Sequence, residues 1–256
     1  MTLQLFHRFG IYASSTTGPQ PVVRFDASTL SLSNGATVNS MTSGGYTAAV
    51  PAPATAPTFN STGLNGNPSV QFDGTDMLVT TAFVPELGGS DYSFYTVVSI
   101  DAADTDDRLA SVVASDASVT NGAWISRLYD NGALDDTVQY FLGDAGIRID
   151  NTAISGNQKQ FILSLRVDID SGAKKDIMSL DAPLFRDTDL TQFQSASAPH
   201  YEYLVAPYIW LTSTDTNIPG STATSTRQFG EFRAYNEYID DVTHESIMQE
   251  LFAKWT

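Results

Sequence analysis

The 256-residue chain contains no cysteine and little positive charge. Without cysteine it can form neither disulfide bonds nor metal sites built on thiolates. Its 13 Lys and Arg residues stand against 29 Asp and Glu residues, which gives a formal net charge of −16. Binding to nucleic acid or to an anionic membrane surface needs clustered Lys and Arg, so we expect neither as a partner.

Signals for export and for membrane insertion are also missing from the sequence. The first 15 residues, MTLQLFHRFGIYASS, lack the basic start and the long apolar core of a signal peptide. No apolar run approaches the roughly 18 residues that a membrane-spanning helix needs. We therefore expect synthesis in a cytoplasm without a cleaved export signal.

Short segments rich in β-branched and aromatic residues predict an all-β fold, because Gly, Asn, Asp or Ser clusters separate nearly all of them. Asp73-Gly74 lies between two apolar runs and predicts a β hairpin there. The Pro-rich stretch 51–57 cannot donate a full set of ladder hydrogen bonds, so it should cross the surface or form an edge. The predicted strands are 21–26, 69–72, 77–80, 92–100, 108–114, 123–129, 137–142, 161–167, 175–180, 203–211 and 228–235.

One segment has the period of a helix instead. Ile247, Leu251 and Trp255 recur at i, i+4 and i+8, which predicts a helix over 241–254 with one apolar face. Asp240 or Asp241 can cap its start, and Lys254 complements the dipole at its end. This helix should pack against the rim or back of the β sandwich.

Residues 1–20 precede the first core strand and end in a Ser-Thr-Thr-Gly-Pro linker. Their apolar residues suit strand addition on a neighbouring subunit or a strand within the same domain, and the sequence leaves both open. We expect a docking and linker segment over 1–20 and a single domain over 21–256. The expected assembly contacts are Leu3, Leu5, Phe9 and Ile11.

Three stretches resemble the concanavalin A-like lectin/glucanase superfamily, specifically the laminin-G-like domains of phage and bacterial surface proteins. The first is VVRFDAS with LSNGATVNSM, in which Met41 stands where tryptophan is usual. The second is APTFNSTGLNGNPSVQFDGTDMLVT at 56–80, and the third is FGEFRAYNEYIDDVTHESIMQELFAKW at 229–255. The resemblance implies a two-sheet jelly-roll sandwich closed by one C-terminal α-helix. It says little about the ligand, because function depends on sites that vary within a fold.

Catalytic patterns are absent from the sequence. The glucanase branch of the superfamily carries a Glu-x-Asp-x-(x)-Glu strand, and retaining hydrolysis needs two carboxyl groups about 5–5.5 Å apart. The chain has no G-x-S-x-G, P-loop or H-E-x-x-H motif, and its three histidines lack ligand spacing, so we expect surface histidines and no enzyme. No glutamate falls in the glucanase pattern; the glutamates are 86, 202, 231, 237, 245 and 250, and the histidines are 7, 200 and 244.

Aromatic residues in predicted strands are the candidates for binding glycans, because aromatic faces stack on sugar rings. They are Trp124, Tyr129, Tyr208 and Trp210, for which packing in the core is the alternative. Strand alternation places Tyr208 and Trp210 on one face and Ile209 and Leu211 on the other, without saying which pair faces the core.

Calcium is the one cofactor that the sequence leaves open. Asp73 and Asp76, and the acidic stretch 101–107, offer the oxygen ligands that Ca²⁺ prefers. A turn residue and a solvated loop are the simpler interpretations, because no spacing matches a defined calcium loop.

These observations predict a non-enzymatic virion surface protein of a tailed phage. It would be a head decoration, head fibre or tail-associated adhesin that contacts other virion proteins, forms a homo-oligomer and binds host-surface polysaccharide. A phage protein reaches the outside by lysis and needs no export signal. The alternatives are a carbohydrate-binding lectin domain of a bacterial surface protein and, third, a divergent glycanase.

Overall fold

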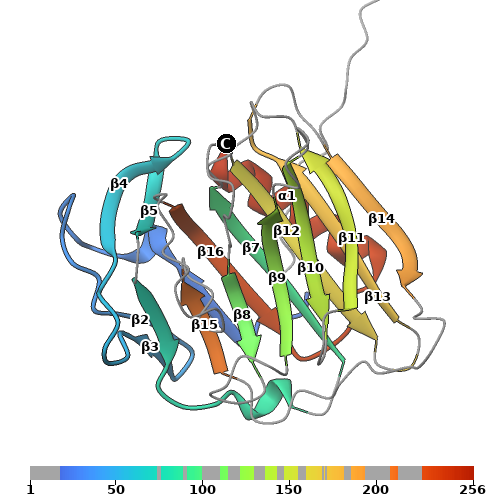
Figure 1. The fold of residues 1–256 in the computed structure, drawn as a ribbon, viewed down its shortest axis with the longest axis horizontal. Coiled ribbons are helices and arrows are strands. Elements are labelled where there is room, and N and C mark those ends of the chain that lie inside the picture. Colours follow the sequence, from blue (N-terminus) through green and yellow to red (C-terminus); the bar gives the residue numbers. More distant parts are fainter. Residues whose placement is uncertain are drawn as a thin grey trace, which may run out of the picture.

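The computed structural model forms two facing antiparallel sheets and one helix (Figure 1). It describes residues 18–73, 76–88, 91–99, 110–114, 122–129, 136–142, 147–154, 160–168, 170, 172–181, 186–193, 208–212 and 227–256. For 110–114, 122–129, 136–142, 147–154, 187–193 and Thr212 only the backbone is described.

The first sheet, here called sheet A, has eight strands within the described residues. Their order is β14 (Arg186–Phe193), β13 (Gly172–Ser179), β12 (Gln160–Asp168), β7 (Tyr92–Ser99), β16 (Arg227–Tyr235), β5 (Asn67–Phe72) and β4 (Thr58–Leu64). The eighth strand, β1 (Val23–Asp26), pairs with β16 beside β5.

The second sheet, sheet B, also has eight strands within the described part of the chain. Their order is β11 (Ile147–Ile154), β10 (Asp136–Leu142), β9 (Gly122–Tyr129), β8 (Ala110–Ala114), β15 (Tyr208–Thr212), β6 (Met77–Thr80), β3 (Tyr46–Ala49) and β2 (Ser40–Ser43). Two short 3-10 helices, η1 (Ala27–Thr29) and η2 (Pro85–Leu87), lie between strands. The predicted two-sheet jelly-roll sandwich with one C-terminal helix is confirmed.

Strand alternation divides the apolar residues between two cores. In β12, Phe161, Leu163 and Leu165 are fully buried between the sheets. Ile162 on the opposite face of the same strand belongs to a second apolar cluster, which the C-terminal helix completes. The strands β7 and β12 are therefore buried on both faces, and their outer faces also bury polar residues such as Ser93 and Ser164.

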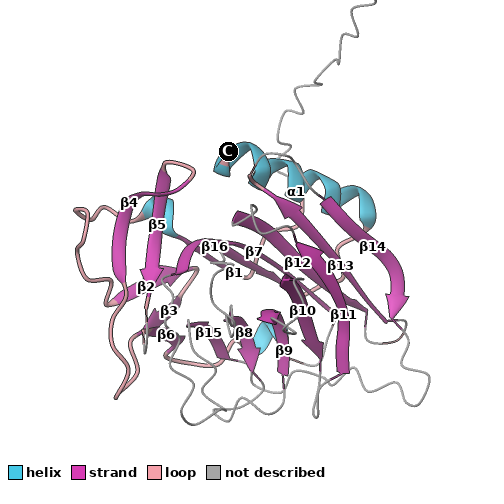
Figure 2. Cartoon of the chain, turned by 45° about the horizontal axis from the view of Figure 1, so that its top comes forward, coloured by secondary structure: helices cyan, strands magenta, loops and turns pink. Residues whose placement is uncertain are grey.

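The helix α1 (Asp241–Trp255) lies along the outer face of sheet A (Figure 2). Asp240 caps it by accepting a hydrogen bond from the Thr243 amide at 2.8 Å. Its buried face is the predicted apolar stripe joined by one histidine: His244, Ile247, Met248, Leu251 and Trp255. Among the described residues, no helix is both long and apolar enough to cross a bilayer.

A glycine in β16 makes room for the end of this helix. At Gly230 the pairing of β16 with β7 shifts register. A Cβ atom at this position would come within 2.9 Å of the Trp255 ring and of the Leu64 side chain. The missing side chain therefore allows Trp255 to lie directly against the sheet.

The predicted hairpin around Asp73-Gly74 is wrong. The strands on its two sides belong to different sheets, because β5 pairs with β4 and β16 whereas β6 pairs with β3 and β15. The buried Asp76 carboxylate accepts a hydrogen bond from the Asp73 amide at 2.9 Å and shapes the connection between sheets. Asp-Gly indicates a turn of the chain, but the strands before and after this turn enter different sheets and do not pair with each other.

Five strands lie where the sequence predicts none: β2, β3, β4, β11 and β14. Their residues are mostly polar or small, and pairing with neighbours, not local preference, places them in the sheets. The Pro-rich stretch 51–57 lies outside the strands and makes one isolated bridge, from Thr55 to Asp76, as expected of a surface crossing.

Candidate functional site

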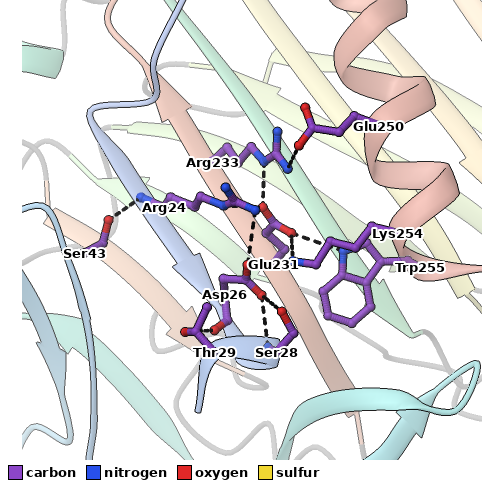
Figure 3. A network of polar contacts seen from close by, with 10 residues as sticks. All are labelled: Arg24, Asp26, Ser28, Thr29, Ser43, Glu231, Arg233, Glu250, Lys254 and Trp255. Atoms are coloured by element: carbon purple, nitrogen blue, oxygen red, sulfur yellow. Dashed lines mark hydrogen bonds and ion pairs between the residues drawn. The ribbon is translucent and has the colours of Figure 1, made fainter. Parts of the chain in front are cut away.

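Glu231 accepts hydrogen bonds from four side chains on the outer face of sheet A (Figure 3). Arg24 and Arg233 each reach Oε1 at 2.7 Å through Nε, and Lys254 reaches Oε2 at 2.6 Å. The indole N–H of Trp255 donates to Oε2 at 3.2 Å. Glu231 is 1% exposed, so this carboxylate anchors the helix and has no access to a substrate.

Asp26 from β1 joins the same network. It accepts from Lys254 Nζ at 2.6 Å and from the Ser28 hydroxyl at 2.6 Å. Burial alone would raise the pKa of Asp26, but the hydrogen bonds from Lys254 and Ser28 outweigh it and hold the pKa below the ordinary value. We define Arg24, Asp26, Glu231, Arg233, Glu250 and Lys254 as the C-terminal clasp, because together they tie β1, β16 and the end of α1.

A second polar cluster ties down the start of α1. The His244 ring bridges two strands, with Nδ1 3.0 Å from the Tyr95 hydroxyl of β7 and Nε2 3.0 Å from Asp176 Oδ2 of β13. Arg186 of β14 contacts the same Asp176 oxygen at 2.6 Å. His244 is 2% exposed, so the expectation of a surface histidine is wrong here. We call His244, Tyr95, Asp176 and Arg186 the N-terminal clasp.

Burial lowers the pKa of His244, and the nearby charges of Arg166 and Arg186 lower it further against the opposing effect of Asp176. Burial would raise the pKa of Asp176, but hydrogen bonds from His244 and Arg186 outweigh it and keep the pKa low. A neutral histidine beside an ionised carboxylate must donate from Nε2, so the Tyr95 hydroxyl donates to Nδ1. All polar positions of the ring are thereby used in holding the helix.

The sequence could have revealed this role through spacing alone. His244 stands at i, i+3, i+4 and i+7 with Ile247, Met248 and Leu251, which places it on the buried face of α1. His7 and His200 lie outside the described residues.

The outer face of sheet B differs from that of sheet A. In β15, Ile209 and Leu211 are 0% and 1% exposed and belong to the core between the sheets. Tyr208 and Trp210 are half-buried on the opposite face. The structure thus resolves the alternation: this aromatic pair faces outward from the sandwich.

Strand register relates Trp210 to a second predicted residue. Trp210 pairs with Val112 of β8, and Val112 pairs with Trp124 of β9. Neighbouring strands are about 4.8 Å apart, so the two tryptophan backbones lie about 10 Å apart in one cross-strand row. Tyr129 pairs with Thr137 near the other end of β9, away from this row. For Trp124 and Tyr129 only the backbone is described.

The same row continues from Trp210 in the other direction through small residues. Trp210 pairs with Val79 of β6, which pairs with Ala49 of β3, which pairs with Ser40 of β2. Val79 and Ala49 are half-buried and Ser40 is exposed. None of the five adjacent strands β8, β15, β6, β3 and β2 contains Asp, Glu, Lys, Arg or His. We call the outer side of these five strands the neutral face.

The two residues predicted to bind calcium, Asp73 and Asp76, are in contact, but no third acidic residue joins them within the described residues. Asp76 is buried and accepts from the Thr55 hydroxyl at 2.6 Å, whereas Asp73 is exposed. The charge of Asp76 raises the pKa of Asp73. Across the described ranges, no three His, Asp or Glu residues are grouped so as to hold a metal ion. Calcium binding by Asp73 and Asp76 stays a prediction.

The other predicted positions fall outside the described residues. These are the assembly contacts Leu3, Leu5, Phe9 and Ile11, and the acidic stretch 101–107.

Solved structures with the same fold come from several carbohydrate-related proteins. Trypanosoma rangeli sialidase in complex with sialic acid has a TM-score of 0.54 at 12% identity, covering 90% of this chain and 33% of the sialidase chain. A botulinum neurotoxin type C structure, described in terms of its interaction with two ganglioside molecules, has a TM-score of 0.58 at 13% identity over 91% of this chain and 51% of that one.

A GH54 α-L-arabinofuranosidase has a TM-score of 0.53 at 12% identity, covering 94% of this chain and 60% of the enzyme chain. This chain therefore spans between about one third and three fifths of these proteins. No protein-family model matches the sequence, and no curated protein matches it either. The structural similarity establishes a shared β-sandwich fold. Because the sequence identities are this low, the laminin-G-like resemblance stays an expectation.

Proposed function

We propose that the protein is a non-enzymatic, glycan-binding β sandwich whose binding surface is the neutral face of sheet B. The observation that carries the proposal is Trp210, an outward-facing and half-buried tryptophan. Its cross-strand row also contains Trp124 and has no charged residue from β9 to β2. An indole ring offers a flat apolar surface to the C–H face of a sugar. Ser40 and other hydroxyl-bearing residues beside it offer hydrogen bonds to sugar hydroxyls.

Two further observations support binding without hydrolysis. The sandwich neighbours include a sialidase in complex with sialic acid and a botulinum neurotoxin whose cell entry depends on gangliosides, so this fold occurs in proteins that bind sugars. The one glutamate in the family-like closing strand, Glu231, is buried in ion pairs and is unavailable as a nucleophile or acid. The glycanase alternative is supported by the lectin/glucanase resemblance of the sequence and by the sialidase and arabinofuranosidase neighbours.

The site of action that we propose is the virion surface of a tailed phage, as a head decoration, head fibre or tail-associated adhesin. The sequence resemblance to phage laminin-G-like domains supports it, and so does the apolar segment 1–20, which is suited to docking on another subunit. The strong net negative charge keeps neighbouring copies from associating through other surfaces.

Glycan binding is tested by screening the whole protein against a glycan array and a polysaccharide panel, alongside a Trp210→Ala variant. We expect binding that the substitution removes while the melting temperature stays within a few degrees. Release of reducing sugar from any member of the panel would support the glycanase alternative instead. Binding that is indifferent to Trp210 would place the site elsewhere.

The virion role is tested by deleting residues 1–18. We expect the truncated protein to fold, but to lose its oligomeric state in light scattering and its attachment to virions of the encoding phage. If it keeps both, the segment is a strand or tail of its own domain. If the full-length protein binds glycans but no virions, the lectin domain of a bacterial surface protein becomes the better description.

A further inference from the structure

The distribution of charge assigns a ligand class to the neutral face: we infer that it takes uncharged glycans and rejects carboxylated or sulfated ones. The inference rests on the proposed function and goes beyond it, because the aromatic row alone does not distinguish neutral from anionic sugars. The structural neighbours that are described with sialic acid and gangliosides concern acidic ligands, so the inferred preference for uncharged glycans differs from theirs.

Cationic side chains are what an anionic sugar would need, and in this protein many of them are committed elsewhere. Six of the 13 Lys and Arg residues form ion pairs on the outer face of sheet A, on the opposite side of the sandwich from the neutral face. They are Arg24, Arg166, Lys174, Arg186, Arg233 and Lys254. Their positive charge is cancelled by the carboxylates that they hold.

Sheet B supplies no compensating excess of positive charge. Its five adjacent strands on the neutral face have no charged residue at all. The remaining three strands contribute two basic residues, Arg127 and Arg148, and two acidic residues, Asp136 and Asp150. Arg148 lies in the row of Trp124 and Trp210, but on β11, four strands from Trp210. The sheet is therefore neutral as a whole, within a chain whose net charge is −16.

An anionic sugar would meet two costs at this surface. Its carboxylate or sulfate would lose water against Val79 and Trp210 without gaining a cationic partner from the five strands of the neutral face. The negative potential of the whole protein would also repel it on approach, and salt would weaken that repulsion. A neutral sugar meets neither cost, because its C–H faces stack on the indole and its hydroxyls stay hydrogen-bonded.

The experiment compares each bound neutral polysaccharide with its own carboxymethylated and sulfated derivatives, so that backbone and linkage stay constant. We expect the derivatives to bind at least about tenfold more weakly at low salt, with the difference shrinking as salt is added. Val79→Lys should restore binding of the anionic derivatives, and Val79→Gln, of similar length and no charge, should not. Ser40→Lys repeats the test at an exposed position, where the substitution leaves folding unaffected.

The outcomes separate the two proposals. Equal or stronger binding of the anionic derivatives overturns the assignment of ligand class and leaves glycan binding intact. Failure of the lysine variants to improve anionic binding also counts against it. Absence of binding to every neutral and anionic member overturns the proposed function, and the ligand class with it.

Discussion

The two outer faces of the sandwich use charge in opposite ways. The outer face of sheet A carries the N-terminal and C-terminal clasps, and α1 covers it (Figure 2). The neutral face of sheet B carries no charged residue over five adjacent strands and exposes part of Trp210. On the outer face of sheet A, the charges of the two clasps are paired and hold α1 in place.

A single helix is fixed on sheet A by apolar contacts and by ion pairs. Ile247, Met248 and Leu251 form the apolar middle of the contact, and an ionic clasp lies at each end. Apolar burial supplies most of the free energy, because buried ion pairs roughly balance the cost of removing their water. The clasps set the position and direction of the helix, since each charge must meet a particular partner.

The largest expected loss of stability comes from removing the apolar anchor. Trp255 is fully buried, and Trp255→Ala should lower the free energy of unfolding by about 3–5 kcal/mol. Leu251→Ala should lower it by about 2–5 kcal/mol for the same reason. Chemical denaturation measures both losses. The control is Val242→Ala, because Val242 lies on α1 but is 84% exposed. Unchanged stability in both variants would mean that the helix does not pack on sheet A.

Breaking the C-terminal clasp should cost somewhat less. Glu231→Gln leaves the buried Arg233 and the partly buried Lys254 with less negative charge, and we expect a loss of about 3 kcal/mol. Glu237→Gln makes the same chemical change at an exposed position and should have almost no effect. Equal stability of the two variants would show that the clasp does not hold the helix. Glycan binding by folded Glu231→Gln protein should stay unchanged.

The N-terminal clasp predicts a smaller effect that depends on pH. Because the pKa of His244 is lowered on folding, its contribution is complete above the unfolded value of about 6.5 and is lost as the pH falls below it. The facing carboxylates Asp176 and Glu245 have lowered pKa values, so their contributions are lost only at more acidic pH. Tyr95 and Arg186, which also face the ring, have raised pKa values and do not titrate in this window. The charge of Arg166 faces the ring as well.

The measurement is the melting temperature between pH 7.5 and pH 5.5, for the natural protein and for His244→Gln. We expect a steeper fall in the natural protein, because the variant has no proton to gain at this position. Identical slopes would show that the buried histidine is not linked to folding in this range.

The sequence predicted the elements whose residues repeat with a clear period. The strands β7, β12 and β16 and the helix α1 have long apolar or alternating patterns, and all were expected near their observed bounds. By contrast, β14 reads RDTDLTQF and β2 reads SMTS, which have the composition of loops. Such strands form because a neighbour completes their hydrogen bonds, and local preference does not encode that neighbour.

The candidate site was predictable only in part, for a similar reason. Alternation in β15 grouped Tyr208 with Trp210, but the face that they occupy depends on how β15 is seated between β6 and β8. The partners of Glu231 lie as far as 207 residues away in the sequence, at Arg24. Contacts of that separation follow from the assembled sheet order and not from any local motif.

The smallest expected effect on stability belongs to the neutral face, where we place glycan binding. Trp210→Ala removes a half-buried side chain from an outer face, so stability should fall by at most about 1–2 kcal/mol, whereas binding should be lost. The direct measurement is titration calorimetry of a bound neutral polysaccharide against three proteins: natural, Trp210→Ala and Glu231→Gln, all below their melting temperatures. We expect no heat of binding for Trp210→Ala and natural affinity for Glu231→Gln. Natural affinity in Trp210→Ala, or loss of affinity in Glu231→Gln, would contradict the assignment of binding to sheet B and of anchoring to sheet A.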